Sequence, residues 1–416
     1  MHDEAIQIRQ PTGDTETLRA FIRPVSTAFA DDYTDEMFQM DRQLWEVDRL
    51  IGAVDGETWV GAAGALSMRL TVPGGEVRAA GLTDVGVAPS HRRRGILTRM
   101  MRWLLDQATE RAEPVAILYA SDGAIYPNFG FGMGTLRGTF EIDRHAFRFA
   151  RPAEPLGRVR LVDVDEGMRL IPALFERLRT ERVGEVSRHP DRWRLQLLAD
   201  DGRMRPGLGM KSNAVLEVDG QLRGYAIYRV KSEWDERGAK NTLTVLELSG
   251  LDPAAERALW EWLAGIDLVA KIQAWRTSVP SPLFLQMATP RRLGLTIADG
   301  MWIRLIDLQA ALEARTYAAG GTVTLEVTDA FCPANEGRWT LDVASDRGMA
   351  SVSAATTAVE ADVALDTTDL ATVYLGTFSF ADLARAGRLA ELRPGGVAAA
   401  DLLFRTAEAP HSATMV

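Results

Sequence analysis

The feature that most constrains the fold is an arginine-rich loop that ends in a glycine, residues 88–95, between a predicted strand and a predicted helix. Residues 82–87 alternate like a half-buried strand, and apolar residues then recur at helical spacing from Leu97 to Ala108. The loop carries three consecutive arginines, and Gly95 lets a ligand approach the backbone closely. The first amides of a helix point outward with partial positive charge. The sequence therefore predicts a pyrophosphate-binding site here.

A second strand is expected at residues 114–120, an unbroken apolar run typical of a strand buried on both faces of a parallel sheet. Strand, helix and strand then form one right-handed crossover, with the loop at the carboxyl end of the first strand. About thirty residues after Gly95 comes Tyr126, followed by Phe129-Gly-Phe131. Two alternatives stay open: the arginine run is a solvated helix start, and Tyr126 is a packing residue before a turn.

Composition narrows the classes of protein that remain. A chain of 416 residues with 46% hydrophobic and 25% charged residues is expected to form several globular domains. It has no run near the ~20 apolar residues of a membrane helix and no secretory signal, so we expect a cytoplasmic protein without a membrane partner. The single cysteine, Cys332, and five histidines without ligand spacing predict no metal site. The net charge of −10 argues against nucleic acid and favours cationic partners, although solubility alone explains it equally well.

The chain divides into three predicted segments, residues 1–149, 150–295 and 296–416. Pro152, Pro155 and Gly157 mark the first boundary, and prolines near residues 280–290 mark the second. The middle segment repeats the order of the first: a hairpin with an Asp-Gly turn at 218–226, a strand at 243–248 and a helix from Pro253. Its loop, residues 251–256, has two carboxylates in place of arginine and glycine, so it should repel phosphate.

The third segment has its own pattern of strands and short helices. Strands are expected at residues 321–327 and 337–341, and helices at 369–376 and 380–388, both ending in glycine caps. The segment resembles the sterol carrier protein fold, an open sheet beside helices. Such a fold can hold lipid, but we expect a packing role.

The motifs together resemble a known family. The spacing Arg92-x-x-Gly95-x-Leu97 is similar to the acetyl-CoA loop of the GNAT superfamily of N-acetyltransferases, Arg/Gln-x-x-Gly-x-Gly/Ala, with Leu97 at the last position. Tyr126 with Phe-Gly-Phe resembles the second half of the GNAT active site. The whole chain is similar to the enhanced intracellular survival (Eis) family. This resemblance implies an α+β/α/β fold class: tandem GNAT-like domains, the second degenerate, and a sterol-carrier-protein-like α+β domain.

The resemblance also implies an activity and a set of site residues. Members are acetyl-CoA-dependent N-acetyltransferases that form homohexamers and modify amines, aminoglycosides among them. By analogy Tyr126 is the general acid, and the carboxylate of the last residue is the general base. That residue is phenylalanine in well-known members and Val416 here. The implied acetyl-CoA contacts are Val85, Gly86, Val87, Arg92, Arg93, Arg94, Gly95, Ile96, Leu97, Thr98, Ser121 and Asp122.

Residue chemistry favours direct transfer to an amine in a ternary complex, since no motif supports a covalent intermediate. Tyr126 can protonate the departing CoA thiolate, and the backbone N–H of Val87 can stabilise the oxyanion. We expect a small polycationic substrate; the alternatives are a protein lysine Nε-acetyltransferase and a non-catalytic lipid-binding or scaffold protein. Three aromatic and three acidic residues either line an amine pocket or form ordinary helix faces. They are Phe29, Phe38, Trp45, Asp31, Asp32 and Glu36.

Overall fold

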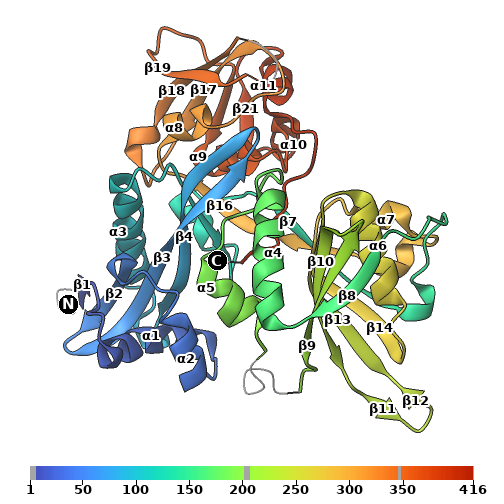
Figure 1. The fold of residues 1–416 in the computed structure, drawn as a ribbon. Helices are drawn as coiled ribbons and strands as arrows, with labels where there is room; N and C mark the ends of the chain where they lie inside the picture. Colours follow the sequence, from blue (N-terminus) through green and yellow to red (C-terminus); the bar gives the residue numbers. More distant parts are fainter. Residues whose placement is uncertain (1–5, 201–206, 345–347, 416) are drawn as a thin grey trace. The chain divides into compact units, whose positions relative to one another are not determined.

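The computed structural model describes residues 6–200, 207–344 and 348–415. Its contacts divide the chain into two compact units (Figure 1). The first unit holds the chain as far as Thr135 and then Gly300–Pro410, and the second holds Leu136–Asp299 and His411–Thr414. The second unit is therefore inserted into the first along the chain. No helix within the described residues is both long and apolar enough to cross a membrane.

The first sheet has the strand order β1-β2-β3-β4-β5-β16-β6. Its strands are β1 (Ile6–Arg9), β2 (Leu50–Asp55), β3 (Thr58–Val72), β4 (Gly75–Val87), β5 (Val115–Tyr119), β6 (Gly132–Met133) and β16 (Met301–Leu305). Helices α1 (Thr15–Phe29) and α2 (Asp35–Asp41) lie on one face, and α3 (Ile96–Glu110) lies on the other (Figure 1). The apolar stripe of α3 is fully buried in the core of that second face. The strand, helix and strand predicted around the arginine loop are all present, and β4 and β5 are parallel.

A second sheet in the first unit has the order β19-β18-β17-β20-β21. Its strands are β17 (Gly321–Thr328), β18 (Gly337–Val343), β19 (Ala350–Ala355), β20 (Val363–Asp366) and β21 (Leu389–Glu391). Its helices are α8 (Leu308–Glu313), α9 (Thr367–Tyr374), α10 (Phe380–Arg385) and α11 (Gly396–Phe404). Gly376 and Gly387 follow α9 and α10 with φ of 88° and 70°, a left-handed conformation that glycine tolerates at helix ends. The open sheet beside helices matches the expectation for the third segment.

The sheet of the second unit has the order β15-β7-β14-β13-β10-β9-β8. Its strands are β7 (Leu136–Asp143), β8 (Arg158–Val162), β9 (Lys211–Val218), β10 (Gln221–Lys231), β13 (Asn241–Gly250), β14 (Val269–Thr277) and β15 (Thr296–Asp299), with a small hairpin of β11 (Trp234–Asp235) and β12 (Gly238–Ala239). Its helices are α4 (Val164–Arg179), α5 (Pro190–Arg192), α6 (Pro253–Ala264) and α7 (Pro282–Gln286). The predicted repeat is present: β9 and β10 form the hairpin, and α6 connects the parallel strands β13 and β14.

The chain changes sheets at positions that differ from the expected boundaries near residues 150 and 295. Strand β7 (Leu136–Asp143) already pairs in the second sheet, and β16 (Met301–Leu305) returns to the first sheet beside β5. The break at Pro152 therefore lies inside the second unit. Prolines mark local turns, whereas sheet membership is decided by pairing with a distant strand, such as Ile303 opposite Ile117.

Candidate active site

The arginine loop adopts a backbone suited to binding an anion. Arg93 and Gly95 both have left-handed backbone, with φ of 63° and 70°, and Gly95 immediately precedes α3. Gly95 has no side chain to cap α3, so within the described structure the first amides of this helix receive no side-chain cap. Left-handed residues that alternate with others turn successive N–H groups toward one point. The loop thus offers backbone donors and a helix dipole to a phosphate group.

The three arginines of the loop have different surroundings. Arg92 and Arg93 are exposed to solvent. Arg94 lies 4.0 Å (Nη1) from Oδ2 of Asp55, and His91 Nε2 lies 3.1 Å from the same oxygen. Asp55, at the end of β2, therefore ties the loop to the first hairpin, a contact that the sequence does not reveal. Arg92 and Arg93 remain as the exposed cations of the loop.

The residues after Gly95 begin α3. Ile96 is 2% exposed, and Leu97 packs half-buried against the same core. The leucine at the position of the motif's small residue is thus oriented toward the core of the sheet. Thr98 lies exposed in the first turn. Among the acetyl-CoA contacts implied for Gly95, Ile96, Leu97 and Thr98, it is Gly95 and Thr98 that are exposed to solvent.

Strands β4 and β5 separate at the end that carries the loop. Their parallel pairing runs from Ala79 opposite Val115 to Gly81 opposite Ile117, while β4 stays paired with β3 as far as Val87. The N–H of Ala88 donates to Val60 O at 2.9 Å. Bonded and non-bonded pairs alternate along an antiparallel ladder, so the N–H of Val87 faces away from β3. It points to the side on which β5 diverges, where a thioester oxygen can accept it.

A β-bulge accompanies this separation. Asp84 and Val85 both lie opposite Ala63, and Asp84 has φ of 53°. The strand is distorted at these two residues. Gly86 has another role, because a Cβ there would lie 2.9 Å from Cα of Val25 in α1. Gly86 therefore lets α1 pack closely on β4.

The loop after β5 carries the second group of predicted residues. Ser121 and Asp122 are exposed, and Asp122 Oδ1 accepts the N–H of Ala124 at 2.9 Å, which fixes the turn. Tyr126 begins a short 3₁₀ helix, η4 (Tyr126–Phe129), and is 5% exposed. Its ring packs edge-to-face on Phe131, with 6.0 Å between centroids.

Burial raises the pKa of the Tyr126 hydroxyl above its usual value. The hydroxyl therefore stays protonated at neutral pH and can donate a hydrogen bond. The proton is held more tightly than in a solvent-exposed tyrosine, so its full transfer to a thiolate with a pKa near ~8.5 is less favourable. Tyr126 is best suited to stabilise the thiolate by hydrogen bonding as it departs.

A cluster that the sequence did not predict lies at the bulge. The indole Nε1 of Trp45 donates to Asp84 Oδ2 at 2.7 Å, and the hydroxyl of Tyr33 donates to Asp41 Oδ2 at 2.9 Å. Burial and then the charge of Asp41 raise the pKa of Asp84 to about 6. The signal in the sequence was an aspartate within an apolar strand. At neutral pH the cluster presents two carboxylates and two aromatic rings on the α1–α2 side of β4.

The acidic and aromatic residues proposed for an amine pocket have separate locations. Asp31 and Asp32 line a hollow of about 730 Å³ after α1, together with Tyr33. Phe38 is 1% exposed and belongs to the core beneath Trp45, and Phe29 is half-exposed. Thus Asp31 and Asp32 face a hollow, whereas Glu36 does not line it and Phe38 occupies an ordinary helix face.

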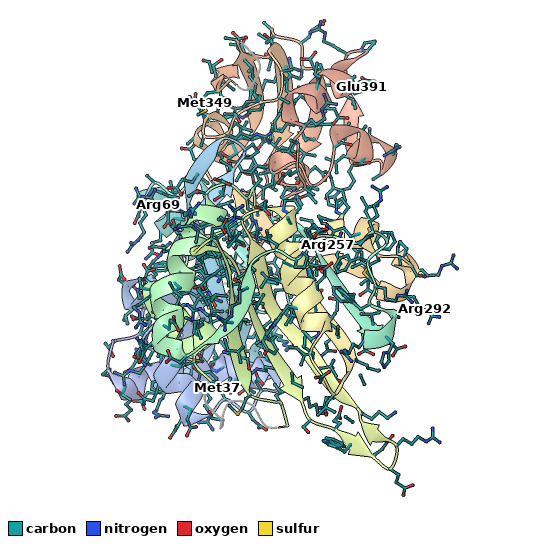
Figure 2. All side chains as sticks on the ribbon, turned by 45° about the vertical axis from the view of Figure 1, so that its right-hand side comes forward. Met37, Arg69, Arg257, Arg292, Met349 and Glu391 are labelled. Atoms are coloured by element: carbon teal, nitrogen blue, oxygen red, sulfur yellow. The ribbon has the colours of Figure 1, made fainter. Side chains whose placement is uncertain are left out.

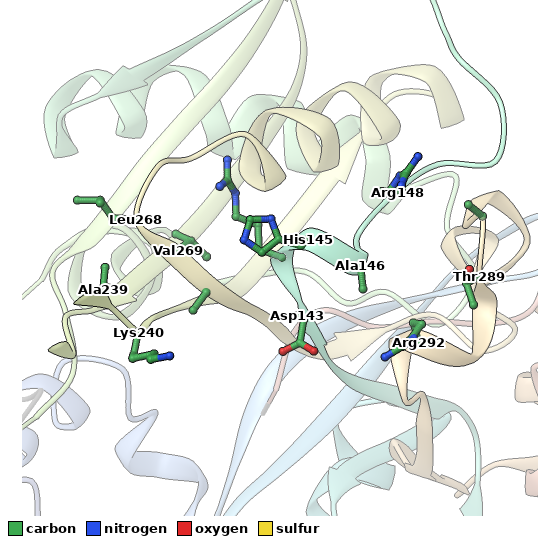
Figure 3. A pocket seen from close by; sticks show the side chains of 13 residues that line it. Asp143, His145, Ala146, Arg148, Ala239, Lys240, Leu268, Val269, Thr289 and Arg292 are labelled. Carbon is green, nitrogen blue, oxygen red and sulfur yellow. The ribbon is translucent and has the colours of Figure 1, made fainter. Parts of the chain in front are cut away.

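A larger hollow, about 1000 Å³, lies within the second unit (Figure 3). Cationic side chains, including Arg148, Lys240 and Arg292, line it around Asp143. Arg292 also marks the outer surface in Figure 2. A fourth, Arg144, donates to the carbonyl of Ala264 at 2.7 Å and so caps α6. This positive hollow is unsuited to a cationic amine.

The second unit differs from the first where a phosphate would bind. Asp252 caps α6 with its own carboxylate: Oδ1 accepts the N–H of Ala255 at 2.8 Å. Glu256 accepts Nη2 of Arg182 at 2.6 Å. The carboxylate of Asp252 thus occupies the start of α6, where a phosphate would bind; that this copy does not bind the cofactor stays a prediction. The last predicted catalytic residue, Val416, lies outside the described residues.

Family models match all three parts of the chain. The acetyltransferase (GNAT) domain matches residues 7–134, a second acetyltransferase (GNAT) domain model matches residues 184–305, and the sterol carrier protein domain matches residues 308–413. The predicted fold class, two GNAT-like domains followed by a sterol-carrier-like domain, is confirmed. GNAT domains imply acetyl-CoA as the co-substrate.

Individual relatives agree with these matches. An uncharacterized N-acetyltransferase of Streptomyces avermitilis is 42% identical over 376 residues, 89% of this chain and 91% of that one. N-acetyltransferase Eis of Mycobacterium tuberculosis is 36% identical over 348 residues, 81% of each chain. The crystal structure of Eis1 from Mycobacterium abscessus superposes with a TM-score of 0.84 at 32% identity, covering 99% of this chain and 100% of that one. A GCN5-related N-acetyltransferase from Anabaena variabilis, 20% identical, shares the fold with a TM-score of 0.84. The superposition covers 99% of this chain and 100% of that one.

Proposed function

Because the chain belongs to the Eis family of N-acetyltransferases, we propose that it acetylates amino groups of small polycationic molecules such as aminoglycosides, with acetyl-CoA as the donor. The observation that carries this proposal is the pairing of two features on β4. The N–H of Val87 faces the side where the strands separate, and the carboxylate of Asp84 lies three residues earlier on the α1–α2 side. In this arrangement the thioester carbonyl would bind at the edge of β4 beside Val87, and the ammonium group of the substrate would bind on the α1–α2 side beside Asp84.

The chain's residues divide the binding of the donor between loop and strand. Arg92 and Arg93, with the open amides at the start of α3, suit a pyrophosphate. The N–H of Val87 suits the carbonyl oxygen of the thioester, where negative charge develops as the amine attacks. We propose that transfer occurs directly in a ternary complex, because the single cysteine, Cys332, packs against the core of the first sheet.

The acceptor amine must lose a proton before or during attack. We propose the terminal carboxylate of Val416 as the general base, with Asp84 as the group that binds the ammonium. Proton transfer from an amine with a pKa near ~10 to a carboxylate near ~3.5 is uphill by about 9 kcal/mol, and to a group near 6 by about 5 kcal/mol. Positioning of the amine is therefore a large part of what either carboxylate contributes. The hydroxyl of Tyr126 then donates to the departing sulfur.

A protein lysine Nε-acetyltransferase is the second candidate, since the hollow beside Asp31 and Asp32 is wide and acidic. A screen separates the two. Release of CoA is monitored with aminoglycosides, linear polyamines, lysine peptides and a monoamine as acceptors, after calorimetry with acetyl-CoA. We expect binding of acetyl-CoA and turnover that is fastest with polycations. Undetectable binding of acetyl-CoA would refute the enzyme assignment, and turnover confined to peptides would favour the second candidate.

We also propose that the chain assembles as a homohexamer, by analogy with the family. Light scattering coupled to size-exclusion chromatography tests this directly. A mass near six chains of 45.7 kDa is expected, and a monomer would contradict the proposal.

A further inference from the structure

The second unit repeats the strand geometry that forms the donor site in the first. Strand β13 pairs in parallel with β14 from Asn241 opposite Val269 to Val245 opposite Ala274. It then continues to Gly250, where among the described strands its partner is β10 on its other edge. A bulge lies at the point of separation, because Ile227 and Tyr228 pair with Glu247 and Val245. Parallel pairing, a bulge and a diverging end occur in the same order as in β4.

In this copy, the place where the strands diverge is occupied by the chain's own tail. Ser412 and Thr414 are 5% and 3% exposed. Glu185 receives three hydrogen bonds from the tail: from Ala413 N at 2.8 Å, from Ser412 Oγ at 3.1 Å and from Thr414 N at 3.3 Å. The N–H of His411 donates to Val183 O at 2.9 Å. Backbone groups and side chains of the tail therefore both form hydrogen bonds with the second unit.

The tail is connected to both diverging strands. On β14, Arg276 donates to the carbonyl of Ala413 at 3.4 Å, beyond the last parallel pair. On β13, Glu247 accepts both terminal nitrogens of Arg188 at 3.0 Å, and Arg188 Nε donates to Thr414 Oγ1 at 2.7 Å. The tail thus lies where a donor's arm would lie if this copy bound one.

The side chains that bind the tail are fixed in position and carry charge. The Arg188 guanidinium lies 3.8 Å from the ring centre of Phe175 and 4.6 Å from that of Trp193. Although burial opposes it, Arg188 and the amide of Ala413 hold the pKa of Glu185 below its usual range. Glu185 is therefore ionised at neutral pH, and charge-assisted hydrogen bonds to it are strong.

We propose that the second GNAT-like fold has kept the cleft of a donor-binding domain and uses it as a receptor for residues His411–Thr414 of its own chain. Its function is then to fix the course of the last residues, and so the position of the terminal carboxylate. This second step rests on the proposed role of Val416. The receptor itself depends only on the contacts of the second unit.

The test uses a chain that ends at Pro410 and a synthetic peptide of residues 409–416. We expect the peptide to bind the shortened chain in calorimetry, and to restore turnover. Replacing Ser412 and Thr414 in the peptide by alanine and valine should weaken binding about ten- to a hundred-fold, since each substitution removes a hydroxyl that is hydrogen-bonded to a charged side chain. A scrambled peptide is the control. If the shortened chain still binds acetyl-CoA but not the peptide, the receptor is refuted.

A second measurement avoids the need for a shortened chain. Glu185→Gln in the full-length protein should speed release of the last residues by a carboxypeptidase about tenfold or more, because the tail opens more often. Glu181→Gln, at an exposed glutamate on the same segment, is the matched control. Equal release rates in the two variants would refute the receptor. If the peptide binds yet the shortened chain keeps full turnover, the receptor stands and the role of Val416 fails.

Discussion

The indole of Trp45 donates a hydrogen bond to the carboxylate of Asp84, from the segment after α2 to the bulge of β4. The bond spans 2.7 Å and fixes a carboxylate three residues before the amide of Val87. Burial and the charge of Asp41 raise the pKa of that carboxyl to about 6. The carboxyl of Asp84 is therefore ionised at neutral pH, but its surroundings make the charged form unfavourable. A bound ammonium group would stabilise that charge.

Asp84→Asn tests this state through stability. The pKa of Asp84 is raised in the folded protein, so its contribution is greatest below about pH 4 and is lost as pH rises through about 6. Between pH 4.5 and 7.5 the natural protein should lose about 2 kcal/mol relative to the variant in urea unfolding. Asp106→Asn, at an exposed site on α3, should show no such difference.

The same substitution should weaken binding of the acceptor. We expect KM for a polyamine to rise in Asp84→Asn, more at pH 7.5 than at pH 5, because the carboxylate it removes is charged mainly above pH 6. The affinity for acetyl-CoA should be unchanged. An unchanged KM at both pH values would remove Asp84 from the acceptor site.

Tyr126→Phe should lower kcat by about 10²-fold, the scale for loss of a group that donates a proton or hydrogen bond to the leaving atom. The ring contact with Phe131 survives, so affinity for acetyl-CoA should stay within a factor of two. Tyr228→Phe, at a buried tyrosine of the second unit, serves as the control. If Tyr126→Phe keeps more than half of kcat, the sulfur takes its proton from water.

Reversing the charge of Arg92 and Arg93 together should weaken acetyl-CoA binding by about 10²- to 10³-fold, since charge-assisted contacts are replaced by repulsion. Calorimetry measures the change. The matched control is glutamate at Arg291 and Arg292, two adjacent exposed arginines of the second unit. Similar losses in both double variants would mean that overall charge, not this loop, governs binding.

Acetyl-CoA should bind with a stoichiometry of one per chain. The second copy caps α6 with Asp252 and holds the tail between its diverging strands. Native mass spectrometry or calorimetry with a chain of known active fraction gives the ratio. A ratio near two would show that the second fold also accepts the donor.

One glycine added after Val416 should abolish most turnover while acetyl-CoA binding persists. The extra residue moves the carboxylate by up to ~3.5 Å, too far to keep one hydrogen bond to the amine. Deleting Met415 and Val416 should be at least as damaging. A glycine added at the N-terminus controls for chain length, and full activity of the C-terminal extension would assign the base to another group.

The sequence predicted the elements around the loop because each has a strong local pattern. Helix α3 follows from its apolar spacing, and the left-handed backbone at Gly95 from the glycine itself. The bulge was not predictable, since left-handed backbone at Asp84 has no local signature. The same holds for the Asp55 contacts with His91 and Arg94, which depend on a hairpin packing beside the loop.

Pairing between segments that are distant in sequence was the second feature that could not be predicted. Gly132 and Gly134 precede β7 but do not by themselves indicate a change of sheet, whereas Pro152 and Pro155 form a conspicuous but purely local break. The docking of Ser412 and Thr414 likewise depends on Glu185, more than two hundred residues away in sequence. Such partners are selected by tertiary packing, which a local sequence pattern does not reveal.

The return of β16 to the first sheet has a consequence for biosynthesis. Strand β5 has β4 on one edge and Met301–Leu305 on the other, so the hydrogen-bonding edge of β5 stays bare until the ribosome has passed Leu305. A nascent chain of the first 149 residues would expose that edge, the type that recruits foreign strands. All strands of the inserted unit are synthesised before β16, so this unit can fold first. The first sheet is then completed when β16 pairs with β5. Fragments cut at the proline-rich break should aggregate, whereas permuted chains that keep β16 beside β5 should stay soluble.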